Sequence, residues 1–248
     1  MAKTAFIEWL ETEQGQYVRH WVESRHDQLV TDIFGFNAVQ IGLPQLELLR
    51  ANRMPFRFHC DENGSDQKSD AQVTASPLEL PFATSSLDLV VLPHVLEFSD
   101  DPHQVLREVE RVLVPEGSVL ITGFNPFSLW GIHRRLTRHS HEAPWRGRYI
   151  SVLRLKDWCK LLGLETQMGC FGCYAPALRQ KKWLRRWRFM EPAGDRWWPF
   201  AGGVYMLQAV KRVHGMRLIT PNWKENRTAK SLATVIQQRH PQRTSNER

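Results

Sequence analysis

The sequence predicts an α/β protein built on a mostly parallel sheet. Short apolar runs alternate with helical patterns from residue 37 onward, and the run LDLVVL (87–92) is continuous enough for a strand buried on both faces. At 248 residues the chain can bury a sizeable core, and its 42% hydrophobic and 24% charged content is typical of a globular protein.

The first 36 residues predict a helical extension ahead of the sheet. Apolar side chains recur at helical spacing over residues 4–34, and Gly15 divides this pattern into two pieces. We therefore assign residues 1–36 to an N-terminal helical extension.

Five strands and two helices are predicted over the next 90 residues or so. The strands fall at 38–42, 56–60, 71–76, 87–92 and 118–124. One helix is expected over residues 43–52, and a second begins at Pro102 with Asp101 as its N-cap residue. Strands that alternate with helices imply parallel pairing with right-handed crossovers.

Beyond residue 125 the pattern is less regular. Residues 126–150 form a basic connection, residues 151–163 form a helix that Gly163 ends, and two further strands fall at 164–170 and 202–212. The expected α/β domain therefore spans residues 37–212. Residues 213–248 form a basic tail that we expect to be largely disordered.

The net charge of +7 conceals two halves of opposite sign. Residues 1–126 contain 9 Lys and Arg against 19 Asp and Glu, whereas residues 127–248 contain 24 against 7. This asymmetry indicates an anionic partner, RNA or a membrane surface, and the run RQKKWLRRWR (179–188) and the tail are the candidate contacts. A solvated basic C-terminus without a partner explains the charge equally well.

The chain is expected to be cytoplasmic. The N-terminus does not have the pattern of a signal peptide, and no window of ~18 apolar residues could span a membrane. Four cysteines are too few for a disulfide framework. Cys170 and Cys173 have the spacing of half a zinc site without matching ligands, so we interpret them as buried thiols and expect no metal.

Residues 79–126 carry a series of motifs in a fixed order. These motifs are Leu80-Pro81-Phe82, Leu87-Asp88-Leu89-Val90, His94-Val95-Leu96-Glu97 and Leu113-Val114-Pro115-Glu116-Gly117. In their order and spacing they resemble the class I S-adenosylmethionine-dependent methyltransferases of the small-molecule, methyltransferase-11-like type. A weaker match extends over residues 37–212. The resemblance implies a Rossmann-like, doubly wound sheet with an antiparallel last strand, and S-adenosyl-L-methionine as the cofactor.

The resemblance also implies where the cofactor binds. In an open parallel sheet the ligand lies beyond the carboxyl ends of the strands, where the strand order reverses. Asp61 ends the second strand, 19 residues after Gly42, and an acid at that spacing accepts hydrogen bonds from ribose hydroxyls. The alternative is that Asp61 is one of several acids in a solvated loop with Glu62, Asp66 and Asp70. The residues expected around the cofactor are Gly42, Leu43, Pro44, Asp61, Ser76, Pro77, Leu78, Pro93 and His94.

Two positions depart from the family pattern. The family usually has two or three glycines where this chain has Gly42-Leu43-Pro44, and often has Asp where this chain has Ser76. S-adenosylmethionine has no pyrophosphate for a glycine loop to cradle. The N-terminus of the helix expected at 43–52 would instead offer N–H groups to the cofactor's carboxylate.

His94 is the candidate catalytic residue, as a general base that takes a proton from the methyl acceptor; shaping the cofactor site is its alternative role. Residues 125–150 are the candidate acceptor-side lid, and a packed surface loop is the alternative. The candidate substrate contacts in this lid are Asn125, Trp130, His133, Arg134 and Arg135.

The sequence thus predicts a methyltransferase that acts on a small-molecule or anionic acceptor. Two other functions remain open: a methyltransferase-like binding or regulatory module without catalysis, and an RNA-associated protein. The fold by itself does not separate them, because this architecture supports many unrelated functions.

Overall fold

The computed structural model describes residues 2–62, 72–137, 144–177, 187 and 190–213. These residues belong to one compact unit, residues 1–213. Residues 214–248 form a second unit that lies outside the described residues, so the expected disorder of the tail stays a prediction.

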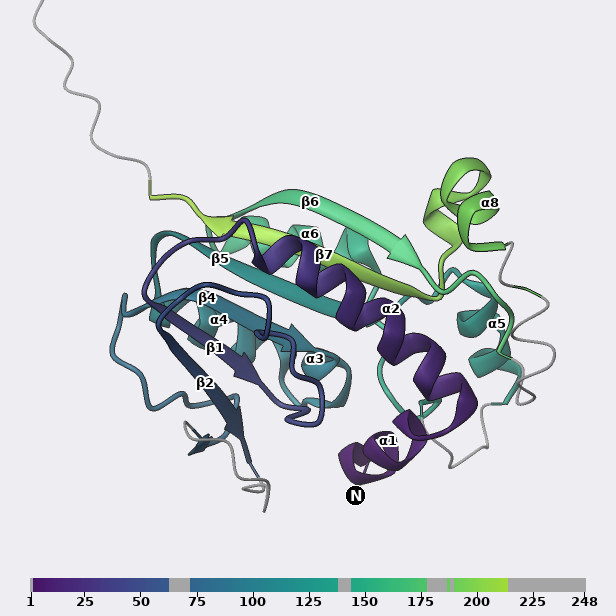
Figure 1. Ribbon diagram of the computed structural model, residues 1–248, viewed down its shortest axis with the longest axis horizontal. Helices are drawn as coiled ribbons and strands as arrows, with labels where there is room; N and C mark the ends of the chain where they lie inside the picture. Colours follow the sequence, from purple (N-terminus) through teal and green to yellow (C-terminus); the bar gives the residue numbers. More distant parts are fainter. Residues whose placement is uncertain (1, 63–71, 138–143, 178–186, 188–189, 214–248) are drawn as a thin grey trace, which may run out of the picture. The chain divides into compact units, whose positions relative to one another are not determined.

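Two helices come first, four strands follow with no helix between them among the described residues, and helices and strands alternate only after the fourth strand (Figure 1). The helices are α1 (Ala2–Leu10), α2 (Glu13–Val30), α3 (Val95–Phe98), α4 (Pro102–Val112), α5 (Leu129–Leu136), α6 (Val152–Leu161), α8 (Met190–Trp197) and the 3₁₀ helix η2 (Pro199–Ala201). The strands are β1 (Asn37–Ile41), β2 (Phe56–Asp61), β3 (Gln72–Thr74), β4 (Leu87–Pro93), β5 (Leu113–Phe124), β6 (Leu164–Gly172) and β7 (Val204–Lys211).

The seven strands form one sheet in the order β3-β2-β1-β4-β5-β7-β6. The first five strands of this order pair in parallel, and β7 runs antiparallel between β5 and β6. The predicted Rossmann-like sheet with its antiparallel last strand is confirmed. The strand order reverses between β1 and β4, which is where this fold binds ligands.

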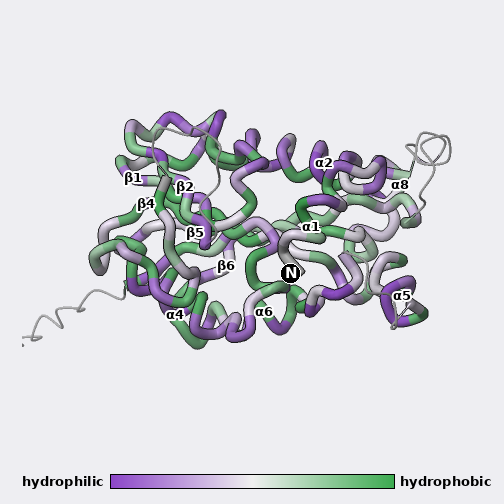
Figure 2. The backbone as a smooth tube through the Cα atoms, turned by 90° about the horizontal axis from the view of Figure 1, so that it is seen from below, coloured by the Kyte–Doolittle hydropathy of each residue, from purple (hydrophilic) through white to green (hydrophobic). Residues whose placement is uncertain are grey.

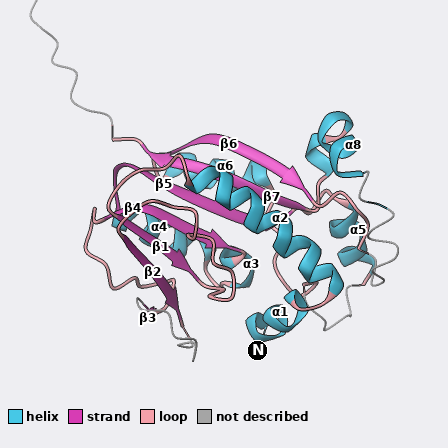
Figure 3. Ribbon diagram, viewed as in Figure 1, coloured by secondary structure: helices cyan, strands magenta, loops and turns pink. Residues whose placement is uncertain are grey.

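Helices cover both faces of the sheet, with α2 in front of it and α4 and α6 behind it in Figure 3. A hydrophobic core lies on each face. One core joins the strands to α4 and α6 through residues such as Val109 and Leu155. The other core joins the opposite face to α1 and α2 through Phe6, Val22 and Leu120. Hydrophobic and hydrophilic residues accordingly alternate along α2 in Figure 2. The N-terminal extension is therefore part of the folded unit rather than an appendage.

Local capping signals placed two of the helices correctly. The Asp101 carboxylate accepts the backbone N–H groups of His103 and Gln104, both at 3.0 Å, at the start of α4. Gly163 follows α6 with φ of +72°, a conformation that other residues rarely adopt.

The break in the N-terminal helix lies before Gly15 rather than at it. Thr12 caps α2 by accepting the N–H of Gly15 at 3.2 Å, so this glycine lies in the first turn of α2. A Cβ atom on Gly15 would lie 2.2 Å from the Trp9 carbonyl oxygen. The glycine is needed because the end of α1 packs directly against this turn.

Candidate functional site

A cavity of about 140 Å³ lies at the carboxyl ends of β1 and β4. Twelve residues line it: Phe6, Gly42, Leu43, Glu62, Pro77, Leu78, Pro93, His94, Val95, Phe98, Ser99 and Asp100. Six of them, Gly42, Leu43, Pro77, Leu78, Pro93 and His94, are among the nine that the sequence predicted to surround the cofactor. The other three, Pro44, Asp61 and Ser76, are each next in sequence to a lining residue. Their roles stay predictions.

The loop after β1 is held by a buried side chain instead of by glycines. The amide of Gln40 in β1 donates to the carbonyl oxygens of Gly42, Leu43 and Leu46, at 3.3, 2.9 and 2.6 Å. Its oxygen accepts the N–H of Leu48 at 3.0 Å. The loop thereby keeps Gly42 and Leu43 at positive φ, 75° and 46°, and these two residues line the cavity.

The prediction of a helix over residues 43–52 is therefore wrong, because this segment forms successive turns. The Leu43 and Leu46 carbonyl oxygens accept from Gln40, and the backbone bonds within the segment join residues two or three positions apart rather than four. Without a helix there, the expected set of N–H groups at a helix N-terminus is also absent from the described loop.

Two acidic residues follow one another at the end of β2. Asp61 is buried, whereas the exposed Glu62 lines the cavity. The Ser76 hydroxyl donates to Glu62 at 3.0 Å and accepts the N–H of Leu78 at 3.3 Å. Ser76 thus fixes both the carboxylate and the segment that carries Pro77 and Leu78. The sequence predicted the acidic position but not Glu62, although it directly follows Asp61.

His94 and Glu97 form a buried pair beside this cavity. The distance from His94 Nδ1 to Glu97 Oε2 is 2.7 Å, and both side chains are 1% exposed. The other Glu97 oxygen accepts the N–H of Phe124. His94 Nε2 is buried and has no hydrogen-bond partner among the described residues. Glu97 ends the motif His94-Val95-Leu96-Glu97, but the sequence did not predict its contact with His94.

The backbone of His94 has an unusual conformation for a residue with a side chain. Its φ is 52° and its ψ is 20°, and its N–H donates to the Thr122 carbonyl oxygen at 2.9 Å, which ties the end of β4 to β5. Such conformations cost about 1–3 kcal/mol and are concentrated at functional sites.

Aromatic side chains surround the imidazole. Ring centroids of Phe6 and Phe124 lie 5.2 and 4.6 Å from that of His94. Tyr149 stacks on Phe124 with centroids 5.1 Å apart, and its buried hydroxyl has no partner among the described residues. Burial raises the pKa of Tyr149 well above its ordinary value, with a smaller contribution from Glu97. His94, the candidate general base, therefore lies among aromatic side chains that largely exclude water.

The predicted acceptor-side residues divide into buried and exposed groups. Trp130 is fully buried, and its indole N–H donates to the Ala175 carbonyl oxygen at 2.8 Å. The Asn125 amide donates to the carbonyl oxygens of Phe200 and Gly202, so it holds the turn after β5. Asn125 also lines a second cavity, of about 410 Å³, together with exposed Phe127.

The basic residues of α5 lie at its C-terminal end. His133 packs against Trp145, with centroids 4.6 Å apart, and Arg134 donates to the Trp145 carbonyl oxygen at 3.0 Å. The Arg134 guanidinium also lies 4.9 Å from the centre of the Tyr149 ring, whereas Arg135 is exposed. These contacts link α5 to the segment over the His94–Glu97 pair, but contact with an acceptor stays a prediction.

His26 of α2 is a second buried histidine near this site. Its Nδ1 donates to the Val22 carbonyl oxygen at 2.8 Å, and its Nε2 lies 3.5 Å from the Thr122 hydroxyl. Burial lowers the pKa of His26 from 6.5 to about 4. The folded protein therefore keeps this imidazole neutral, whereas the unfolded chain protonates it below about pH 6.5.

Acid should accordingly destabilise the protein through His26. Between pH 6.5 and 4 the unfolded state binds the extra proton, so the free energy of unfolding falls as the pH falls, by roughly 3 kcal/mol. Urea unfolding between pH 4 and 7.5 should show a weaker pH dependence in His26→Leu than in wild type. The control is His20→Leu on the exposed side of the same helix. Equal pH dependence in wild type and His26→Leu would contradict this assignment.

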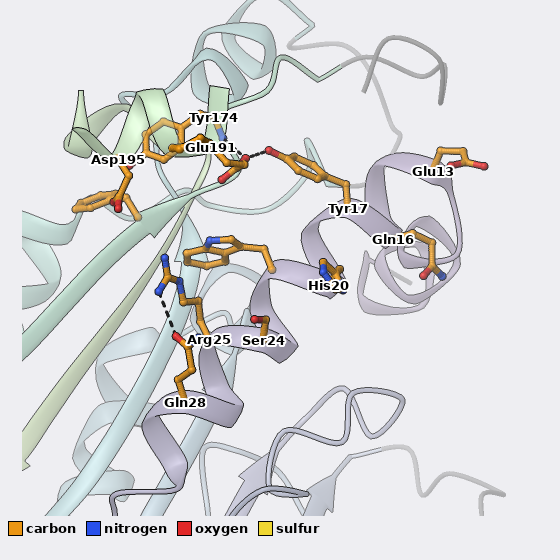
Figure 4. A pocket seen from close by; sticks show the side chains of 13 residues that line it. Glu13, Gln16, Tyr17, His20, Ser24, Arg25, Gln28, Tyr174, Glu191 and Asp195 are labelled. Carbon is orange, nitrogen blue, oxygen red and sulfur yellow. Dashed lines mark hydrogen bonds between the residues drawn. The ribbon is translucent and has the colours of Figure 1, made fainter. Parts of the chain in front are cut away.

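A larger cavity, of about 840 Å³, lies between α2 and α8 (Figure 4). Tyr17 points toward Glu191 there and donates a hydrogen bond to its carboxylate, which also accepts the N–H of Tyr174 at 3.0 Å. This cavity has no lining residue in common with the cavity at β1 and β4. Because it lies away from the point where the strand order reverses, we take the smaller cavity as the candidate site.

Other predictions concern metals, membranes and the basic run. Among the described residues no group of three or more potential ligands could hold a metal ion, and no helix is long and apolar enough to cross a membrane. Cys173 is buried and Cys170 partly buried, and both are free thiols. Apart from Trp187, the run 179–188 lies outside the described residues, as does the tail beyond Val213.

Comparison with known proteins identifies the class. Residues 57–121 match the model of a methyltransferase domain. The fold resembles a chain from a Haloferax volcanii complex that contains the Trm112 methyltransferase activator (TM-score 0.60, 16% identity, 87% of this chain and 100% of that chain). It also resembles a SAM-dependent methyltransferase from Thermotoga maritima (TM-score 0.58, 14% identity, 79% of this chain and 92% of that chain). The fold is therefore that of the Rossmann-like methyltransferases.

The matched segment and the fold support a class I S-adenosylmethionine-dependent methyltransferase domain in this chain. The chain is 34% identical over 158 residues to the uncharacterized protein YafS of Escherichia coli. These 158 residues are 64% of this chain and 65% of that protein. It is 33% identical over 84 residues to malonyl-[acyl-carrier protein] O-methyltransferase 1 of Coxiella burnetii, covering 32% of this chain and 30% of that protein. The chain thus spans less than two thirds of the length of either curated relative.

Proposed function

We propose that this protein is an S-adenosylmethionine-dependent methyltransferase that binds its cofactor in the cavity at the carboxyl ends of β1 and β4. The observation that carries the proposal is the buried, unpartnered Nε2 of His94, which belongs to a residue in the wall of that cavity. Perturbed and unpartnered polar groups inside a concave site are typical of active sites.

The chemistry of the cavity wall fits this cofactor. Glu62, with Asp61 beside it, offers carboxylate oxygens that accept hydrogen bonds from hydroxyl groups. Pro77 and Leu78 offer an apolar surface suited to an aromatic base, and Gly42 lets the ligand approach the backbone closely. When bound, the cofactor supplies an electrophilic methyl group. The protein's part is to align the acceptor and exclude water, and the aromatic residues around His94 suit that role.

The acceptor of the methyl group is a small molecule in this proposal. The Coxiella relative is named for a malonyl group attached to an acyl-carrier protein, but the match covers less than a third of either chain. It therefore supports methyl transfer more than any particular acceptor. A cytoplasmic location and an anionic partner stay predictions of the sequence.

A non-catalytic module is the second candidate, and one observation favours it. Phe6 of α1 is fully buried in the wall of the cavity. The cavity of about 140 Å³ is smaller than the ~300–1,000 Å³ typical of ligand sites. A cofactor therefore requires α1 to shift, and a protein that had lost its cofactor would have no such need.

Calorimetric titration with S-adenosylhomocysteine separates the two candidates. We expect micromolar binding to the wild type, weakened about tenfold or more, or about 1.4 kcal/mol, in Asp61→Asn and in Glu62→Gln. The exposed Glu79→Gln, which removes a nearby carboxylate outside the cavity wall, should bind as the wild type does. If the wild type does not bind S-adenosylhomocysteine at a concentration of about 1 mM, the methyltransferase proposal is wrong and the non-catalytic module is favoured.

A further inference from the structure

We propose that Glu97 is a positioning residue that fixes His94 as a proton acceptor, so that the site suits a methyl acceptor with a proton on its attacking atom. This inference rests on the proposed function and deepens it. It assigns a role to Glu97, and it separates hydroxyl-type acceptors from carboxylates, which are already ionised at neutral pH.

The geometry restricts Glu97 from two sides. One carboxylate oxygen accepts the backbone N–H of Phe124 in β5, and the other lies 2.7 Å from His94 Nδ1. The Glu97 backbone carbonyl also accepts the N–H of Arg148, at 2.8 Å. Because α3 is a single short turn, these bonds to its neighbours fix the carboxylate more firmly than the helix itself would.

This arrangement selects one tautomer of the imidazole. An ionised carboxylate can only accept hydrogen bonds, so His94 Nδ1 must carry the hydrogen. In a neutral imidazole the lone pair is then on Nε2, the atom that is buried without a partner. A histidine that only shaped the site would have no need of a buried carboxylate behind it, since burying a charge is costly.

No other described group near the pair competes as a base at neutral pH. His26 stays neutral, but its Nδ1 hydrogen is directed to Val22 and its Nε2 toward Thr122. Burial raises the pKa of Tyr149 and Tyr205, the two phenols that Glu97 influences, so neither is ionised. Glu62 and Asp100 line the same cavity, and as carboxylates they are much weaker bases than imidazole.

The chemistry that follows is balanced. The acceptor's X–H group gives its proton to His94 Nε2 while X forms a bond to the methyl carbon. The carbon–sulfur bond of the donor breaks, and its sulfur keeps the electron pair and becomes a neutral thioether. The carboxylate of Glu97 stabilises the imidazolium until the proton leaves to solvent. General-base assistance of this kind contributes about 10²–10⁴-fold in rate.

The test reads the tautomer directly. Long-range ¹H–¹⁵N correlation spectra at pH 8 should show the His94 hydrogen on Nδ1 in the wild type. In Glu97→Gln the amide oxygen remains the acceptor for the Phe124 N–H, so the amide NH₂ group faces His94 Nδ1. Because that group is a donor, the imidazole hydrogen of His94 should move from Nδ1 to Nε2. The His94 signals are assigned by their loss in His94→Gln. His26, which donates its Nδ1 hydrogen to Val22, is the internal control and should not change.

A hydrogen on Nε2 in the wild type would overturn the proposal, and this reading holds even if Glu97→Gln does not fold. An unchanged tautomer in a folded Glu97→Gln would also overturn it. Failure of the proposed function looks different, because it appears as absent S-adenosylhomocysteine binding in the wild type, whatever the tautomer. Glu97→Gln should bind S-adenosylhomocysteine within about threefold of wild type, since Glu97 does not line the cavity.

Discussion

Gln40→Leu should lower the free energy of unfolding by roughly 3–5 kcal/mol, measured by urea unfolding. Gln40 is completely buried, and its amide satisfies three carbonyl oxygens and one N–H group of the loop after β1. Leucine fills a similar volume but removes these four bonds. The Gly42 carbonyl oxygen loses its donor, and the Leu43 and Leu46 carbonyl oxygens keep only the backbone N–H groups of Leu46 and Leu48. Each unpaired buried polar group costs about 1–3 kcal/mol.

The same substitution should weaken S-adenosylhomocysteine binding by more than tenfold, because Gly42 and Leu43 line the cavity and take their positive φ angles from this loop. Gln16→Leu, on the exposed side of α2, is the control and should change stability by no more than about 0.5 kcal/mol. A Gln40→Leu protein of wild-type stability would show that the loop does not depend on this amide.

Phe6→Leu should cost up to about 1.5–2 kcal/mol of stability and yet tighten S-adenosylhomocysteine binding, by about tenfold. The Phe6 ring is fully buried between His94 and Phe98, with centroids 5.2 and 4.9 Å away, and it lines the cavity. If the ligand binds only after α1 shifts, its apparent affinity is reduced by the small population of the shifted state. A smaller side chain raises that population.

Gly15→Ala tests the same idea without removing an aromatic ring. The added Cβ would lie 2.2 Å from the Trp9 carbonyl oxygen and would displace α1 from α2. We expect tighter binding here too, measured by calorimetry, and wild-type binding by Phe36→Ala, which removes an exposed ring elsewhere. Weaker or unchanged binding in both Phe6→Leu and Gly15→Ala would mean that α1 does not restrict the cavity.

Much of the sheet could be predicted from the sequence because its central strands β1, β4 and β5 are mostly buried on both faces, whereas β2 is partly exposed and was found from its alternating Phe56, Phe58 and Cys60. The run 87–92 became β4, and the predicted strands at 38–42, 56–60 and 118–124 became β1, β2 and most of β5. Burial on both faces requires continuous apolar residues, which are visible in the sequence without knowledge of the partners. Capping was equally local, since Asp101 and Gly163 act on residues within a few positions of themselves.

The loop after β1 could not be predicted in this way. Residues 43–52 have a helical distribution of leucines, but Gln40 bonds to the carbonyl oxygens that a helix would use. The sequence does not show which groups a buried glutamine side chain will bond to, because its hydrogen bonds depend on how the chain turns back over the strand. The long-range contact of Phe6 with His94 is hidden for the same reason.

The sequence by itself determined the α/β class, the order of the strands along the chain and the motif that contains His94, because burial and capping act over short stretches. Only the tertiary structure decided what surrounds that histidine. Glu97 is three residues away, but its second oxygen is fixed by the Phe124 N–H, and the imidazole ring packs against Phe6 of the N-terminal helix α1. Such contacts join segments about 30 and 90 residues apart, and their energies depend on distances and burial that exist only once the sheet has formed.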